Sequence, residues 1–82
     1  MDIVVGSVVR AKAGRDKGGY FVVTDILDNG RVLICDGKRR KVTSPKCKNI
    51  IHLEATSTVA QDFTTNRQIK NYLKGFMEEK HV

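Results

Sequence analysis

The chain has 82 residues and a mass of 9.2 kDa, with 15 Lys and Arg against 9 Asp and Glu, so its formal net charge is +6. A chain of this length forms one domain and has little room for an enclosed catalytic pocket of about 300–1,000 Å³. Its hydrophobic fraction of 40% argues against disorder, and no apolar run approaches the roughly 20 residues of a membrane span. These features exclude a multidomain enzyme, a membrane protein and a disulfide-dense secreted toxin.

Alternating apolar residues predict that the first two-thirds of the chain forms short β-strands. Val9, Ala11 and Ala13 would share one face of the first strand. A glycine-rich loop over residues 14–19 follows, in which we expect Gly14 and Gly18 to be structural turn residues, free to adopt positive φ. Residues 20–27 are rich in β-branched and aromatic side chains and predict a second strand.

Turn signals divide the next segment into further strands. Asn29-Gly30 between two apolar runs predicts a type I′ hairpin that returns into a strand over residues 31–35. Asp36-Gly37 predicts a second turn into a strand over residues 39–43, which Pro45 ends. We expect a short helical turn over residues 46–49 and a closing strand over 50–53. Short strands with tight turns predict a mainly β fold, a small SH3-like barrel of about five strands.

The composition changes after the predicted barrel (residues 1–54). A polar connector over residues 55–64 leads to an amphipathic C-terminal helix within residues 65–82, helical over about 66–80, with Thr64 or Thr65 as N-cap. An isolated helix of this length is marginal in water. Its apolar stripe therefore either docks on the barrel or enters a groove on a partner protein. The stripe consists of Ile69, Tyr72, Leu73, Phe76 and Met77.

Patterns typical of catalysis are weak. Gly14 and Gly19 have the spacing of a phosphate-binding loop, but Tyr20 and Phe21 stand where the Lys and the Ser or Thr are required. Nucleophilic catalysis needs a base held against a nucleophile, and the sequence supplies no group to orient such a pair. We therefore expect no enzymatic activity and no cofactor.

The cysteines predict no metal site. Cys35 and Cys47 belong to no Cys-x-x-Cys pair, and together with His52 and His81 they form a set with irregular gaps. We expect both cysteines to be reduced thiols packed as small apolar residues.

The basic residues are the most informative feature. Residues 1–55 carry 11 Lys and Arg against 6 Asp and Glu, whereas residues 56–82 carry 4 against 3. Residues 38–41 form an unbroken basic run with no acidic residue in the four positions that follow. A polyanion would relieve the repulsion in this run, and the alternative is a solvated face that keeps the protein soluble. Because aromatic residues are few, contact with phosphates and with the shape of an RNA duplex is expected rather than base stacking.

A resemblance to a known family extends this interpretation. Residues 6–18 alternate apolar and basic residues up to Lys17-Gly18 and resemble the KOW motif, whose glycine lies in the turn between two strands. Residues 20–34, the basic run and Pro45-Lys46-Cys47-Lys48 extend the match, so residues 4–54 resemble the fourteenth-e family of large-subunit ribosomal proteins. Bacterial KOW-domain relatives of this size are also similar, and the short helix suits them better.

The resemblance implies an SH3-like barrel that binds structured ribosomal RNA in the cytoplasm, as a ribosomal or ribosome-associated protein without catalysis. Two alternatives remain open: a protein-interaction module that uses the helix over residues 66–80, and a KOW-type transcription factor. The candidate RNA-binding residues are Arg10, Lys12, Arg15, Lys17, Lys38, Arg39, Arg40, Lys41, Lys46 and Lys48.

Overall fold

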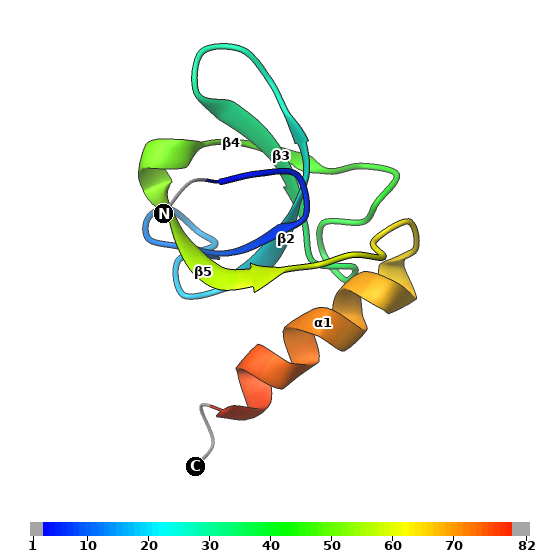
Figure 1. The fold of residues 1–82 in the computed structure, drawn as a ribbon. Helices are drawn as coiled ribbons and strands as arrows, with labels where there is room; N and C mark the ends of the chain where they lie inside the picture. Colours follow the sequence, from blue (N-terminus) through cyan, green and yellow to red (C-terminus); the bar gives the residue numbers. More distant parts are fainter. Residues whose placement is uncertain (1–2, 80–82) are drawn as a thin grey trace.

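The structure is a computed structural model that describes the backbone of residues 3–79 and the side chains of residues 3–76. Figure 1 shows a strongly curved sheet that closes into a small ring, with a helix lying beneath it. The elements in chain order are β1 (Ser7–Ala11), β2 (Tyr20–Ile26), β3 (Arg31–Cys35), β4 (Lys46–Asn49), the 3-10 turn η1 (Ile50–His52), β5 (Leu53–Val59) and α1 (Asn66–Glu79). The prediction of a mainly β barrel-like fold with a C-terminal helix is confirmed.

All five strands belong to one antiparallel sheet in the order β4-β3-β2-β1-β5. The register shifts between Ser7 and Val9 in the β1–β5 pair, and between Val23 and Asp25 in the β2–β3 pair. Irregularities of this kind bend and twist strands. The bend brings the two edge strands, β4 and β5, close together, so that the short turn η1 is enough to connect them.

The central strands are buried on both faces. One apolar cluster fills the inside of the barrel and includes Val9, Phe21 and Ile34. A second cluster lies between the outer face of the sheet and α1, where Val8 and Val22 meet helix residues. Strands buried on both faces show continuous apolar runs instead of alternation, which explains the apolar run at the start of β2.

The helix uses its apolar stripe to dock on the barrel. Ile69 is fully buried and Leu73 is 3% exposed, and both belong to the outer cluster together with Ala60. Tyr72 and Phe76 pack at the margin of this cluster, and the ring of Phe76 lies 5.2 Å from that of Tyr20. Of the two alternatives for the stripe, docking on the barrel is the one observed; the side chain of Met77 lies outside the described residues.

Local signals for turns and caps are confirmed. Asn29 and Gly30 both have positive φ, at 64° and 73°, as the type I′ hairpin requires. Thr65 caps α1 by accepting a hydrogen bond from the Gln68 amide, while Gln68 Oε1 accepts from the Thr65 amide. The structure shows α1 up to Glu79, and the predicted end at Lys80 lies outside the described residues. Within residues 3–79, no helix has the length and apolar character to span a bilayer.

The secondary structure predicted for residues 39–53 was wrong. Residues 36–45 form a loop, because Asp36 Oδ1 accepts hydrogen bonds from the amides of Lys38 and Arg40 and so fixes a tight turn. The strand follows this loop as β4, which pairs with β3, over residues expected to be helical. Residues 50–52 form η1, with the Asn49 side chain accepting from the Ile51 amide.

The expected polar connector is shorter than residues 55–64. Strand β5 continues to Val59 because it pairs with β1, where Ser7 lies opposite Val59 and Val9 opposite Ala55. Thr56 Oγ1 adds a hydrogen bond to the carbonyl oxygen of Val8 at 2.7 Å. The polar residues 56–58 therefore belong to an edge strand here, where the composition had indicated a linker.

Candidate nucleic-acid interface

The loop between β1 and β2 contains three exposed cations, Lys12, Arg15 and Lys17, and one buried carboxylate, Asp16. Gly14 and Gly18 have φ values of 82° and 88°, which only glycine adopts without strain, as predicted for turn residues. The Gly18 amide donates to the carbonyl oxygen of Ala11 at 2.8 Å and closes the loop. Arg15 and Lys17 are exposed, whereas the side chain of Asp16 is only 5% exposed.

Asp16 ties this loop to the basic run. Its Oδ2 accepts a hydrogen bond from Lys46 Nζ at 2.6 Å and lies 3.6 Å from Arg40 Nη2. The hydrogen bond from Lys46 lowers the pKa of Asp16 below its ordinary value, although burial acts in the opposite direction. Asp16 therefore remains a carboxylate near neutral pH and serves as an internal counter-ion for two of the candidate cations.

A third cation is also directed inward. Lys48 Nζ donates to the carbonyl oxygen of Ala13 at 3.2 Å and adds a second link between the β1–β2 loop and β4. The Arg40 side chain is 31% exposed and that of Lys46 is 28% exposed, and Arg40 Nε is buried without a hydrogen-bond partner among the described residues. Arg40 thus links the β1–β2 loop to the loop over residues 36–45, whereas Lys46 and Lys48 link the β1–β2 loop to β4. All three side chains are only half-exposed.

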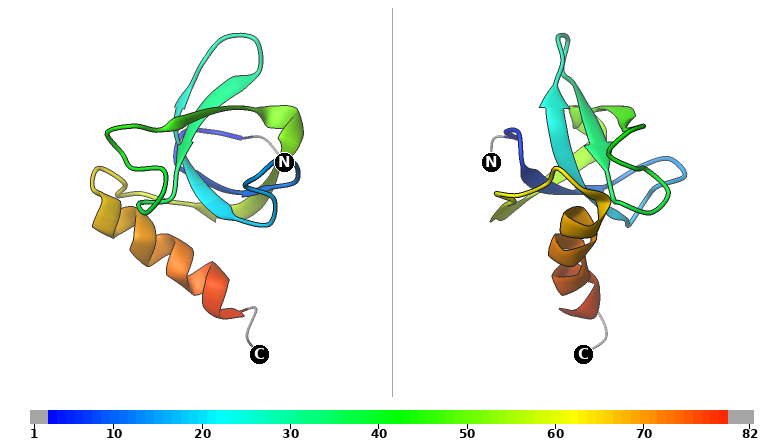
Figure 2. Two further views of the ribbon diagram at one scale, coloured as in Figure 1. Left: turned by 180° about the vertical axis from the view of Figure 1, so that it is seen from behind. Right: turned by 90° about the vertical axis from the view of Figure 1, so that its right-hand side faces the viewer.

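The remaining loop cations form what we call the basic surface. In the right-hand view of Figure 2 the β1–β2 loop and the loop over residues 36–45 both project to the right of the barrel, and Arg40 of the second loop reaches Asp16 of the first. Residues 12–19 and 36–48 contain 9 Lys and Arg against 2 Asp, so this region concentrates the positive charge of the chain. The basic surface consists of six exposed residues, Lys12, Arg15, Lys17, Lys38, Arg39 and Lys41.

One predicted site residue is placed apart from the basic surface. Arg10 lies in β1 and is half-buried, with Tyr20 and Glu54 as its partners in the neighbouring strands. The structure therefore separates the predicted residues into six exposed loop cations, three half-exposed cations that contact the β1–β2 loop, and Arg10 within the sheet.

The two cysteines differ in environment. Cys35 is fully buried, and burial, assisted by the nearby Asp36 charge, raises its pKa to about 11. Cys47 is exposed in β4, so the prediction that both cysteines are packed in the interior was wrong for Cys47. Within the described part of the chain, no three His, Cys, Asp or Glu side chains gather as a metal site would require.

Two residues that organise the interface were missed from the sequence. Asp16 lies 30 positions before Lys46, and no local pattern links them. Asn66, the first residue of α1, accepts a hydrogen bond from the Val42 amide at 2.8 Å through its Oδ1 atom. Both contacts join distant segments, so neither leaves a signal in the spacing of nearby residues.

Comparison with known proteins identifies a relative of the chain. No family model matches the chain. The chain is 33% identical over 85 residues to the large ribosomal subunit protein eL14 of Metallosphaera sedula, covering 95% of this chain and 88% of that protein. This relative is a structural component of the ribosome and not an enzyme, in agreement with the expectation from the sequence. The chain belongs to the eL14 family of large ribosomal subunit proteins.

Proposed function

We propose that this protein binds ribosomal RNA through the basic surface, as a cytoplasmic component of the large ribosomal subunit. The observation that carries the proposal is the convergence of two loops whose exposed charged side chains are all cationic, joined at the buried carboxylate of Asp16. Membership of a ribosomal protein family supports this role. The similarity of residues 6–18 to a KOW motif points in the same direction, and a bacterial source for the chain stays a prediction.

The chemistry of the basic surface suits a phosphate backbone. Each Lys or Arg that neutralises a phosphate releases a condensed counterion, which supplies affinity at low and moderate salt. Asp16 reduces the repulsion among the inner cations, so that the outer cations are held close together at a lower electrostatic cost. RNA duplexes are recognised mainly by shape and by contacts to phosphates and 2′-hydroxyls, which requires no aromatic platform.

A salt titration tests the proposal. The variant with Lys38→Gln, Arg39→Gln and Lys41→Gln removes three exposed charges and leaves Arg40, with its link to Asp16, in place. With about 0.7–0.9 units per phosphate contact, the slope of log K against log salt should flatten by about two to three units. The probe is an in-vitro transcript of large-subunit ribosomal RNA, and a melting curve verifies that the variant folds. An unchanged slope would refute the proposed surface.

The control variant is Arg31→Gln, which removes one exposed guanidinium from the start of β3 outside the basic surface. It should leave the slope within about half a unit of the wild-type value, since a distant charge releases few counterions. Sedimentation of a cell extract adds a test of location: the protein should travel with the large subunit at low salt. A protein that stays with the polymerase fraction would indicate the transcription-factor alternative instead.

The alternative of a protein-binding helix has less physical support. Ile69 and Leu73 of the apolar stripe are already buried against the barrel. A partner would first have to displace α1 and expose the outer cluster to water, at a cost of roughly 1.5–3 kcal/mol for each large apolar side chain.

A further inference from the structure

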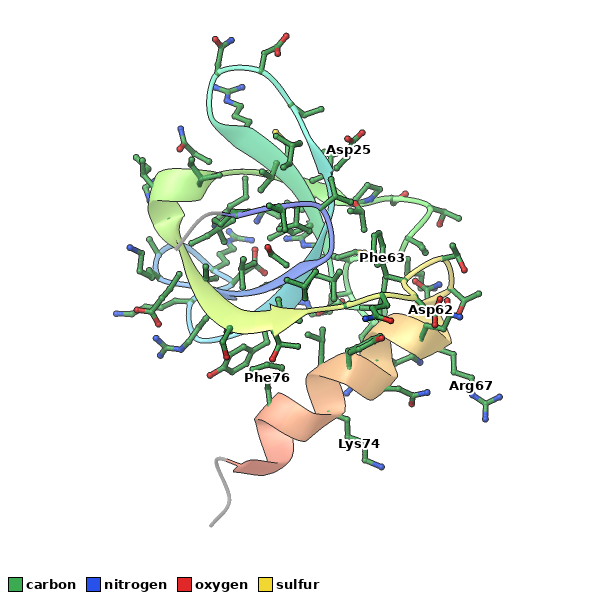
Figure 3. All side chains as sticks on the ribbon, in the orientation of Figure 1. Asp25, Asp62, Phe63, Arg67, Lys74 and Phe76 are labelled. Carbon is green, nitrogen blue, oxygen red and sulfur yellow. The ribbon has the colours of Figure 1, made fainter. Side chains whose placement is uncertain are left out.

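The solvent-facing side of α1 is cationic. Arg67, Lys70 and Lys74 recur at intervals of three and four residues, which places them on neighbouring turns of the helix, and all three are exposed. Figure 3 shows Arg67 and Lys74 directed away from the barrel, whereas Phe76 faces it. The sequence has no Asp or Glu between residues 63 and 77. The helix thus combines an apolar face towards the sheet with a basic face towards solvent.

Arg67 and Lys70 are the most informative of these cations. Neither forms an ion pair with any carboxylate whose side chain the structure describes. The neighbouring acidic residue is Asp62, which is exposed and precedes the helix. Solvated cations at this spacing repel one another modestly, by a few tenths of a kcal/mol per pair. A polyanion that spans both side chains would remove that repulsion.

The basic face of α1 is attached directly to the loop over residues 36–45. A Cβ atom at Gly37 would lie 2.5 Å from the Asn66 carbonyl oxygen and 2.9 Å from Lys70 Cγ, so the loop backbone rests against the first turns of the helix. Near the other end of the basic run, the Val42 amide donates to Asn66 Oδ1 at 2.8 Å. The basic run is therefore fixed to the helix on both sides.

From this arrangement we propose that Arg67 and Lys70 extend the RNA-binding surface, so that one RNA backbone contacts the basic run and then the outer face of α1. The inference rests on the proposed function and adds a second structural element to it. The partner is the phosphate backbone of RNA, because both elements carry one sign of charge and the helix adds it along a line of successive turns. The apolar face of α1 then anchors a rigid cationic edge to the barrel.

The test compares two variants that lose the same chemical group. Arg67→Gln removes an exposed guanidinium from α1, and Arg31→Gln removes one from the hairpin at the opposite end of the molecule (Figure 1). Binding is measured with a fluorescently labelled RNA duplex of mixed sequence over a range of salt concentrations. We expect Arg67→Gln to flatten the slope of log K against log salt by about 0.7–0.9 units, and Arg67→Gln with Lys70→Gln by about 1.5 units. Arg31→Gln should leave the slope unchanged.

The outcomes separate the inference from the proposed function. If Arg67→Gln behaves as Arg31→Gln while the triple variant at residues 38, 39 and 41 flattens the slope, the inference is overturned and the proposed function stands. If the triple variant has no effect, the proposed function is refuted, and the inference that one RNA backbone contacts both elements is overturned with it, even where the helix variants flatten the slope. Glutamine retains the Cγ atom that packs on Gly37 and favours helix, so the variants should melt within about 2 °C of the wild type.

Discussion

The most informative perturbation of the interface is Asp16→Asn. The substitution keeps the shape of the side chain and one acceptor oxygen but removes the negative charge that holds Lys46 and Arg40. The ammonium group of Lys46 and the guanidinium group of Arg40 then lie near each other without a counter-ion, and their side chains are only 28% and 31% exposed. We expect the β1–β2 loop and the loop over residues 36–45 to separate and the native state to lose stability.

The magnitude follows from the contact at 2.6 Å between Lys46 Nζ and Asp16 Oδ2. A hydrogen bond to a charged group contributes about 1.5–3 kcal/mol net, and the contact with Arg40 at 3.6 Å is longer and adds less. Since Asn still accepts one hydrogen bond from Lys46, we expect a loss of about 2 kcal/mol. In a domain of this size each kcal/mol shifts Tm by about 4–8 °C, so Tm should fall by about 8–16 °C.

Thermal melting followed by circular dichroism measures this effect. The matched control is Asp62→Asn, which removes the same charge from an exposed residue outside the Asp16 cluster. Surface changes of this kind stay within about 0.5 kcal/mol, which corresponds to at most about 4 °C. Equal melting temperatures for the two variants would refute the assignment of Asp16 as the internal counter-ion.

The stability that Asp16 contributes should depend on pH, and a comparison of the wild type with Asp16→Asn measures this dependence. The pKa of Asp16 in the folded state lies below its ordinary value of 3.8. Its contribution to stability is therefore complete above that pH and is lost as the pH falls through the folded-state pKa. The gap in Tm between the wild type and Asp16→Asn should persist from pH 7 to pH 5 and close towards pH 2. A gap that grows on acidification would contradict this linkage.

Three further predictions address the fold. Gly37→Ala should lower the free energy of unfolding by about 3 kcal/mol or more, because Gly37 has positive φ and the new Cβ would lie 2.5 Å from the carbonyl oxygen of Asn66. Gly18→Ala also has positive φ but meets open space, so it should cost about 1–2 kcal/mol. Equal losses of stability in urea unfolding would contradict the contact between the loop and α1. Exposed Cys47 should react with a thiol reagent within minutes, whereas Cys35, which is buried in the outer cluster, should react only when the protein unfolds. Rapid labelling of both cysteines would contradict the burial of Cys35 beneath α1. Ile69→Ala should lower the free energy of unfolding by about 2–5 kcal/mol, while a loss below 1 kcal/mol would show that α1 is not docked.

The parts of the fold that depend on neighbouring residues could be predicted from the sequence. The Asn29-Gly30 hairpin and the Thr65 cap each involve residues within four positions, and the chemistry of the turn or cap is sufficient to specify them. The apolar stripe of α1 has the period of a helix, so its burial followed from the marginal stability of an isolated helix.

The parts that failed depend on contacts between distant segments or on one competing side chain. A strand over residues 39–43 was expected from the turn signal at Asp36-Gly37, but the Asp36 carboxylate accepts from two loop amides and stabilises a compact loop instead. Strand β5 runs into polar residues because β1 supplies a ladder partner as far as Val59. The division of the cations into exposed and inward-facing residues required the position of Asp16, which its place in a glycine-rich loop does not reveal.

If the basic surface binds ribosomal RNA in the large subunit, its two loops lie in direct contact with RNA in the assembled particle. Ultraviolet crosslinking of isolated large subunits, followed by mass spectrometry of peptide–RNA adducts, tests it on the assembled particle. We expect adducts on peptides that contain residues 12–19 and 36–45. Adducts confined to the hairpin over residues 26–31, or their absence from both loops in particles that contain the protein, would contradict it.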